Sequence, residues 1–322
     1  MKIIDVAILA FILLLPFSLA MDANQKKSIS AIETKYVYEQ ALRIASEDAT
    51  KALLTGTYED GETIEDKLKN PNLDFALDRF NETLYINLNL KGDKAGQEAL
   101  KSFLPIKLVV AYDGYYLNVW ENVIDNTGKE QVVDTWLPKK PFVYYEEGTN
   151  LIFNFTITDY VSIYDVSTGT YSEGKIADME LLYPTSAILK NINFDNVRRQ
   201  TIVESINDDL ELYSMKYNYL ARKFGFGYKF LIPIVSEDDW NNTIDGITFM
   251  AFLQGMPVPN LDTQINTYAF CASSMKEIRF YYGTDMVYHK EDCSLLINES
   301  IRFQSRKDAA SEGYYPCSVC KP

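Results

Sequence analysis

Four side chains that suit a metal ion lie within the last forty residues, and they constrain the fold more than any other feature. Three residues separate His289 from Cys293, and two residues separate Cys317 from Cys320. Thiolate and imidazole are the donors that zinc prefers, and two closely spaced ligand pairs are typical of small structural zinc sites. The spacing therefore predicts that these four residues bind one structural Zn²⁺ ion.

This pattern uses three of the four cysteines and the only histidine of the chain. A segment of this size buries too little apolar surface to fold alone, so a bound ion would supply the missing stability. The alternatives are a reduced knuckle without metal and a disulfide between Cys317 and Cys320. We expect the remaining thiol, Cys271, to fill apolar space between its neighbours in the fold.

Short motifs surround the ligands, namely Val287-Tyr288-His289-x3-Cys293, Ile301-Arg302-Phe303-x-Ser305, Ala309-Ala310-Ser311-Glu312-Gly313-Tyr314 and Pro316-Cys317-x2-Cys320-Lys321-Pro322. Together they resemble the zinc module of the Ada family of DNA-repair proteins. In that family the first ligand is a cysteine that also accepts a methyl group from DNA phosphate. Here that position is His289, and a metal-bound imidazole has no thiolate with which to attack. The resemblance implies the zinc fold and argues against the repair chemistry.

The first 21 residues contain an unbroken apolar run from Val6 to Leu15. Extended in both directions, this run reaches about the length of a membrane span. Residues 1–21 are therefore a transmembrane anchor or a signal peptide, in which Lys2 is the charged start and Ser18-Leu19-Ala20 resembles a cleavage site. We favour the single-pass anchor, with the carboxyl-terminal part exported. Secretion after cleavage is the alternative.

Residues 22–56 predict a long amphipathic stalk helix. Proline and glycine are absent from 22–55, and Gly56 suits a helix end. Small residues recur every four positions at Ala41, Ala45 and Ala49, so one face allows another helix or a sheet to approach closely. The apolar half that continues into this helix, with Asp5 and Pro16 in it, resembles pilins and pseudopilins. A membrane anchor with a stalk helix is the simpler interpretation.

Residues 57–282 predict an α+β body with a mainly antiparallel sheet, followed by the zinc module at 283–322. Helical spacing over 73–90 is followed by a hairpin around Asp113-Gly114, a dipeptide that favours a type I′ turn, with Tyr112 opposite Tyr115. Further strands are predicted at 132–137, 151–158, 160–165, 228–235 and 247–253. An apolar stripe from Val203 to Leu220 predicts a long helix that begins near Asp195 and packs on the sheet.

The formal net charge of −14 makes a nucleic acid an improbable partner, because a polyanion is repelled over most of the surface. If His289 binds the metal, no histidine remains as a general base, and four protein ligands leave no open position on zinc. These points favour a protein that is not an enzyme.

The leading hypothesis is a membrane-anchored extracytoplasmic component of a pilus-like or transfer-type surface assembly. In it, residues 22–55 contact protein partners or further copies of the chain. The alternatives are an extracytoplasmic binding module whose zinc domain contacts a ligand, and a hydrolase that uses carboxylates.

Overall fold

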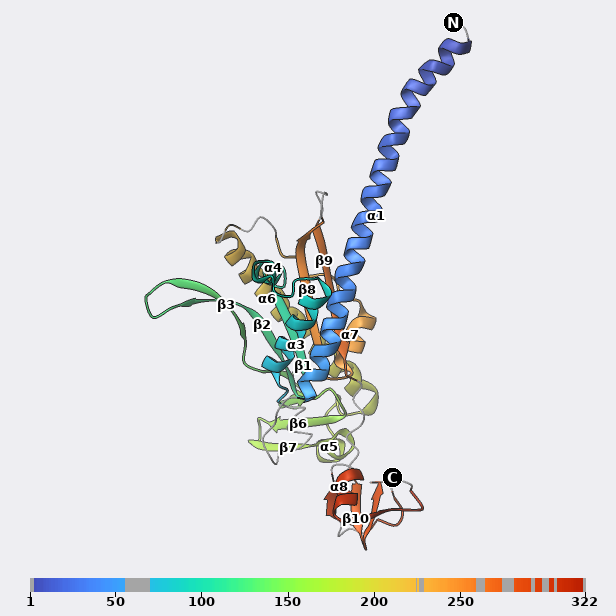
Figure 1. Ribbon diagram of the computed structural model, residues 1–322. Coiled ribbons are helices and arrows are strands. Elements are labelled where there is room, and N and C mark those ends of the chain that lie inside the picture. The colour runs from blue at the N-terminus through green and yellow to red at the C-terminus, as the bar shows by residue number, and fades with distance from the viewer. Residues whose placement is uncertain are drawn as a thin grey trace.

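The computed structural model describes residues 3–55, 70–223, 225, 229–258, 264–273, 281–290, 293–296, 301–303 and 306–320. The side chains of 3–27, 55, 191–192, 281, 302 and 306–308 are outside this description. Within it the chain is α+β, as predicted, with seven helices, a nine-stranded antiparallel sheet and a separate four-stranded sheet (Figure 1).

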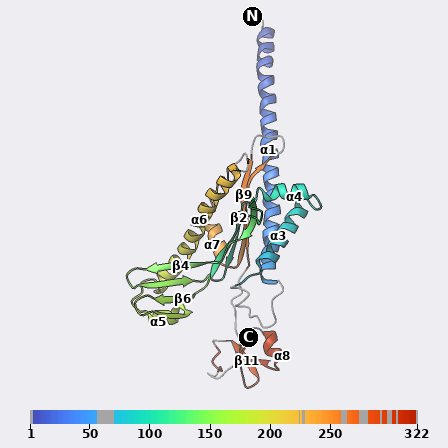
Figure 2. The same ribbon diagram turned by 90° about the vertical axis from the view of Figure 1, so that its left-hand side faces the viewer.

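The large sheet has the strand order β7-β6-β5-β4-β2-β1-β8-β9, and β3 pairs with β2 beside this path. Its strands are β1 (Ile106–Ala111), β2 (Gly114–Ile124), β3 (Glu130–Trp136), β4 (Lys140–Glu146), β5 (Leu151–Phe155), β6 (Tyr160–Asp165), β7 (Thr170–Lys175), β8 (Thr248–Pro257) and β9 (Gln264–Ala272). The sheet curls, so that β4 to β7 project sideways from the strands that carry the main core (Figure 2).

Helices cover both faces of the strands β2, β1, β8 and β9. The helices α6 (Asn191–Lys223) and α7 (Glu237–Ile244) lie on one face, and α1 (Ile3–Thr55), α3 (Leu73–Asn87) and α4 (Lys94–Lys101) lie on the other (Figure 2). A short helix, α5 (Ile176–Leu182), packs beside β7. The rings of Phe80 in α3 and Phe249 in β8 are tilted by 33° with their centroids 5.0 Å apart, which shows how closely the second layer contacts the sheet.

The carboxyl-terminal half of α1 is part of the body, because it packs against α3, β8 and β9. Ala45, Ala49 and Leu53 are completely buried, as the four-residue spacing of small side chains predicted. Small side chains allow the helix axis to lie close to the sheet. The predicted stalk at 22–56 is therefore continuous with the body at its end, and α1 is helical from Ile3 onward.

Among the residues whose side chains are described, no helix is both long and apolar enough to cross a membrane. The predicted anchor at 1–21 lies outside those residues.

The hairpin between β1 and β2 forms, but its predicted register is wrong by two residues. Val110 pairs with Tyr115, and the turn consists of Tyr112 and Asp113. Gly114 is already a strand residue, and a Cβ atom there would lie 2.5 Å from the carbonyl oxygen of Lys140 in β4. The glycine therefore serves the close approach of a neighbouring strand instead of the turn.

Other boundaries also differ from the predictions. Residues 229–236 contain no strand, and residue 228 lies outside the description. The helix α6 begins at Asn191, so Asp195 is inside it, where its carboxylate pairs with Arg199 at 2.9 Å. The strands β4, β7 and β9 were not predicted. Pro141 is a residue of β4.

Candidate metal centre

The carboxyl-terminal module is built on a small sheet with the strand order β12-β10-β11-β13. Its elements are β10 (Tyr281–Thr284), β11 (Val287–Lys290), β12 (Ile301–Phe303), α8 (Arg306–Ser311) and β13 (Tyr315–Pro316). Among the residues whose side chains are described, its apolar cluster consists of Tyr288, Phe303 and Ala309, with Tyr314 against it. So small a cluster provides little hydrophobic stabilisation.

A tight turn between β10 and β11 brings His289 into position. Its two residues, Asp285 and Met286, have φ values of 50° and 60°, the left-handed geometry of the hairpin turn that fits the twist of two strands. Gly283 in β10 lies beneath the rings of Phe303 and Tyr314, where a Cβ atom would be 2.5 Å from each. The absence of a side chain at this position lets both rings pack on the strand.

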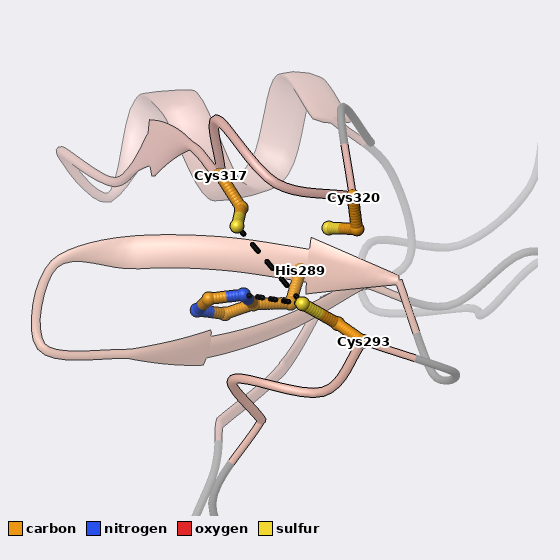
Figure 3. A group of neighbouring side chains, drawn as sticks. All are labelled: His289, Cys293, Cys317 and Cys320. Atoms are coloured by element: carbon orange, nitrogen blue, oxygen red, sulfur yellow. Dashed lines mark hydrogen bonds between the residues drawn. The ribbon is translucent and has the colours of Figure 1, made fainter.

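The four predicted ligands meet at one end of this sheet. His289 belongs to β11, Cys293 follows it, and Cys317 and Cys320 approach from the segment after β13 (Figure 3). Their donor atoms all lie within 4.8 Å of one another. His289 Nδ1 is 3.2 Å from Cys293 Sγ, which is 4.0 Å from Cys317 Sγ.

Three of the four side chains are buried, and Cys320 is half-buried. Backbone hydrogen bonds join the β11 segment, which carries the first ligand pair, to the β13 segment, which carries the second. Cys317 N–H donates to Tyr288 O at 3.0 Å, and Tyr315 N–H donates to Met286 O at 2.9 Å. The two ligand pairs are therefore positioned by the fold of the strands.

Backbone N–H groups also point at the sulfur atoms. Val319 N–H donates to Cys317 Sγ and Lys290 N–H donates to Cys320 Sγ, each at 3.4 Å. Hydrogen bonds from the backbone of Cys320 and Val319 lower the pKa of Cys317, while burial raises the pKa of Cys320. Donors aimed at sulfur stabilise the thiolate form that a metal requires.

The arrangement suits coordination of a metal ion. All four cysteines of the chain are free thiols, so the structure does not contain the alternative disulfide between Cys317 and Cys320. A histidine and three cysteines with converging donors make a four-ligand set, which is compatible with a closed tetrahedral site.

The sequence identified all four clustered residues but not the backbone donors to sulfur, because those depend on the turn after Cys317. Cys271 is apart from the cluster, in β9. It is half-buried, and burial raises the pKa of its thiol. The expectation of a buried apolar filler is therefore met only in part, because the charged groups of Glu47 and Lys51 also act on this thiol.

Comparisons of this chain with protein-family models, with curated proteins and with solved structures gave no match. The resemblances to the Ada module and to pilins therefore rest on the sequence motifs alone.

Proposed function

We propose that His289, Cys293, Cys317 and Cys320 hold a structural zinc ion that folds the carboxyl-terminal module. The convergence of the four donor atoms within 4.8 Å supports this assignment most directly. Three soft thiolates with one imidazole select zinc over the hard cations Ca²⁺ and Mg²⁺, which take oxygen ligands. The small apolar cluster supports it further, because a module of this size needs an added source of stability.

Native mass spectrometry of the full chain tests this assignment. We expect one zinc ion per chain, which a chelator removes together with the order of residues 281–320. Purified protein that carries no metal while the module stays folded would contradict the assignment.

We further propose that the protein is a non-catalytic, membrane-anchored extracytoplasmic component of a pilus-like or transfer-type surface assembly, with α1 as its contact to other subunits. The supporting observation is a row of exposed apolar side chains on α1, before the helix joins the body. Ile29, Ile32 and Tyr36 are spaced by three and four residues and are 54%, 69% and 61% exposed. Such spacing places them on one helix face.

A groove lies beside this row. It has a volume of about 560 Å³ and is lined mainly by apolar side chains of α1, the α3–α4 connection, α4 and the turn after α4, among them Val37, Leu90 and Phe103. Exposed apolar surface of this kind is typical of a protein–protein contact. We infer that an amphipathic helix of a second copy occupies the groove, because its apolar face would cover the apolar lining.

Substitution of the exposed row tests the assembly proposal. The double variant Ile29→Asp with Ile32→Asp should reduce self-association of the full chain in detergent, measured by light scattering after size exclusion. The matched control is Ile124→Asp on β2, because Ile124 is 70% exposed and Ile32 is 69% exposed. Equal association of both variants, or recovery of the native chain as a monomer without membrane, would remove the proposal.

A further inference from the structure

A lysine is buried in the middle of the large sheet. Lys107 lies in β1 between the apolar residues Ile106 and Leu108, and it is 1% exposed. Its Nζ atom is 2.9 Å from Asn118 Oδ1 and 2.8 Å from Asp134 Oδ2. Lysine is almost never buried so completely, so its position suggests a chemical role for this side chain.

The strand register brings the three side chains together. Lys107 faces Asn118 across β1 and β2, and Asn118 faces Trp136 across β2 and β3. Asp134 precedes Trp136 by two residues, so it lies on the same face of the sheet. Amine, carboxamide and carboxylate thus come from three adjacent strands and need no movement of the backbone to meet.

The amide of Asn118 is only half satisfied. Its Oδ1 accepts from Lys107, but its Nδ2 has no hydrogen-bond partner among the described residues, although Asn118 is completely buried. Tyr85 OH and Trp136 Nε1 likewise have no hydrogen-bond partner among the residues that the structure describes. A buried amide nitrogen without a hydrogen-bond partner lowers the stability of the fold. Loss of this nitrogen as ammonia would therefore break no hydrogen bond.

Two opposing effects act on the amine of Lys107. Burial lowers the pKa of Lys107, and the nearby Asp134 opposes this effect. A low-dielectric interior disfavours the charged form of an amine, so burial favours loss of a proton from Lys107. Desolvation in an apolar environment is a known way to make lysine a nucleophile. Asp134 is 28% exposed, which gives the proton carrier contact with solvent.

We propose that Lys107 and Asn118 form an intramolecular amide bond within the folded chain, with Asp134 as the proton carrier. Asp134 first takes a proton from the ammonium group of Lys107. The lone pair on Nζ then attacks Cγ of Asn118, forming the C–N bond. The Cγ–Nδ2 bond breaks as Asp134 delivers a proton to the leaving nitrogen, and one ammonia molecule is released. The new amide nitrogen then loses its extra proton to the carboxylate of Asp134, which gives the neutral amide. No oxidant or cofactor is needed.

The adjacency of the reacting groups is what makes the step feasible. The attacked carbon carries the oxygen that already contacts the amine, and groups held at such distances gain a large rate advantage over separate reactants. The product replaces a buried charge by a neutral amide, which removes its desolvation cost. The bond would fasten β1 to β2 at the centre of the sheet. It depends on these strands alone, so it stands or falls independently of the metal and of α1.

Trypsin distinguishes the open from the closed form. The open chain is cleaved after Lys101, Lys107 and Lys129, which yields peptides 102–107 and 108–129. In the closed chain the side chain of Lys107 is acylated, so trypsin leaves peptide 102–129 intact, and its mass is lower than the sequence mass by one ammonia. We expect the second result for full-length protein purified in its folded state, with the same deficit in the intact chain.

Variants locate the bond. Asp134→Ser should restore the full mass and cleavage after Lys107, since serine can accept a hydrogen bond but cannot carry the proton. The control is Asn122→Ala, at the exposed end of β2, the strand that contains Asn118. This variant should keep the ammonia deficit. Full mass with free cleavage after Lys107 in the native protein overturns the proposal, whether or not the variants fold. A deficit of one water with a link to peptide 130–139 also overturns it, because Asp134 would then be the bonded residue.

Discussion

The hydroxyl of Thr50 in α1 donates a hydrogen bond to the backbone carbonyl oxygen of Cys271 in β9, at 2.7 Å. The same hydroxyl accepts a hydrogen bond from Phe249 N–H in β8, at 3.3 Å. Phe249 and Cys271 face each other in the sheet, so a single side chain of the helix bridges both strands at this point. The end of α1 is therefore joined to the sheet by polar contacts as well as by its small buried residues.

Thr50→Val should lower the free energy of unfolding by about 1–3 kcal/mol, because it leaves two buried backbone groups without this partner while keeping the side-chain shape. Urea denaturation followed by circular dichroism measures the change. Thr34→Val is the matched control, since Thr34 lies on the same helix with its hydroxyl bonded to Ser30 O at 2.7 Å in an exposed position. A loss of similar size in both variants would contradict the bridging role.

Local patterns in the sequence predicted those elements whose contacts follow a simple period. The spacing of Ala41, Ala45 and Ala49 predicts the buried face of α1, and the strand predicted at 151–158 contains β5, in which Leu151 and Phe153 alternate on the buried face. In both cases the side chains that recur at a regular spacing are the ones that pack in the core. The spacing in the sequence therefore indicates the buried face directly.

Elements that depend on a distant partner were missed. The strand β9 forms against β8, and β4 pairs with β5, so their pairing is decided by neighbours in space. Gly114 was assigned to the turn on its local preference, yet the approach of Lys140 decided its place. Lys107 carries a local signal of its own, because a lysine within an apolar strand needs buried partners. The four metal-site residues were identified because their chemistry and spacing are both local.

The metal cluster should accept a change of one donor but not its loss. His289→Cys should retain one zinc ion per chain, because four thiolates also form a closed tetrahedral site. His289→Ala should lose the ion or bind it far more weakly, and Cys317→Ser should do the same. Native mass spectrometry with competing chelator measures each. Cys271→Ser is the control and should keep the metal, as Cys271 lies in β9. Loss of zinc from the Cys271 variant would invalidate the comparison.

Gly283→Ala should disturb the module even though it touches no ligand. The added methyl group would lie 2.5 Å from the rings of Phe303 and Tyr314, so one of them must shift. Overpacking of this kind costs about 1–3 kcal/mol. We expect weaker zinc retention and faster hydrogen exchange in residues 281–290. Gly148→Ala is the control, because nothing lies within 4 Å of a Cβ atom there. Unchanged exchange in the Gly283 variant would show that the ring packing is not tight.

Alkaline pH should destabilise the body through a half-buried tyrosine. Tyr268 in β9 donates to Asp239 Oδ2 at 2.6 Å. Burial, with this carboxylate, raises the pKa of Tyr268 from 10.0 to about 12. Between these values the unfolded chain has lost the phenolic proton while the folded chain keeps it. The contribution of Tyr268 is therefore complete below pH 10.0 and falls as pH rises toward 12.

Urea denaturation across this pH range measures the slope of stability against pH. Tyr268→Phe should reduce the slope, since the variant has no phenol to ionise there, although it starts from a lower stability because the hydrogen bond is lost. Tyr171→Phe is the matched control: Tyr171 also donates to a carboxylate, that of Glu173 at 2.9 Å, but it is 62% exposed. An unchanged slope in the Tyr268 variant would show that this proton is not linked to folding.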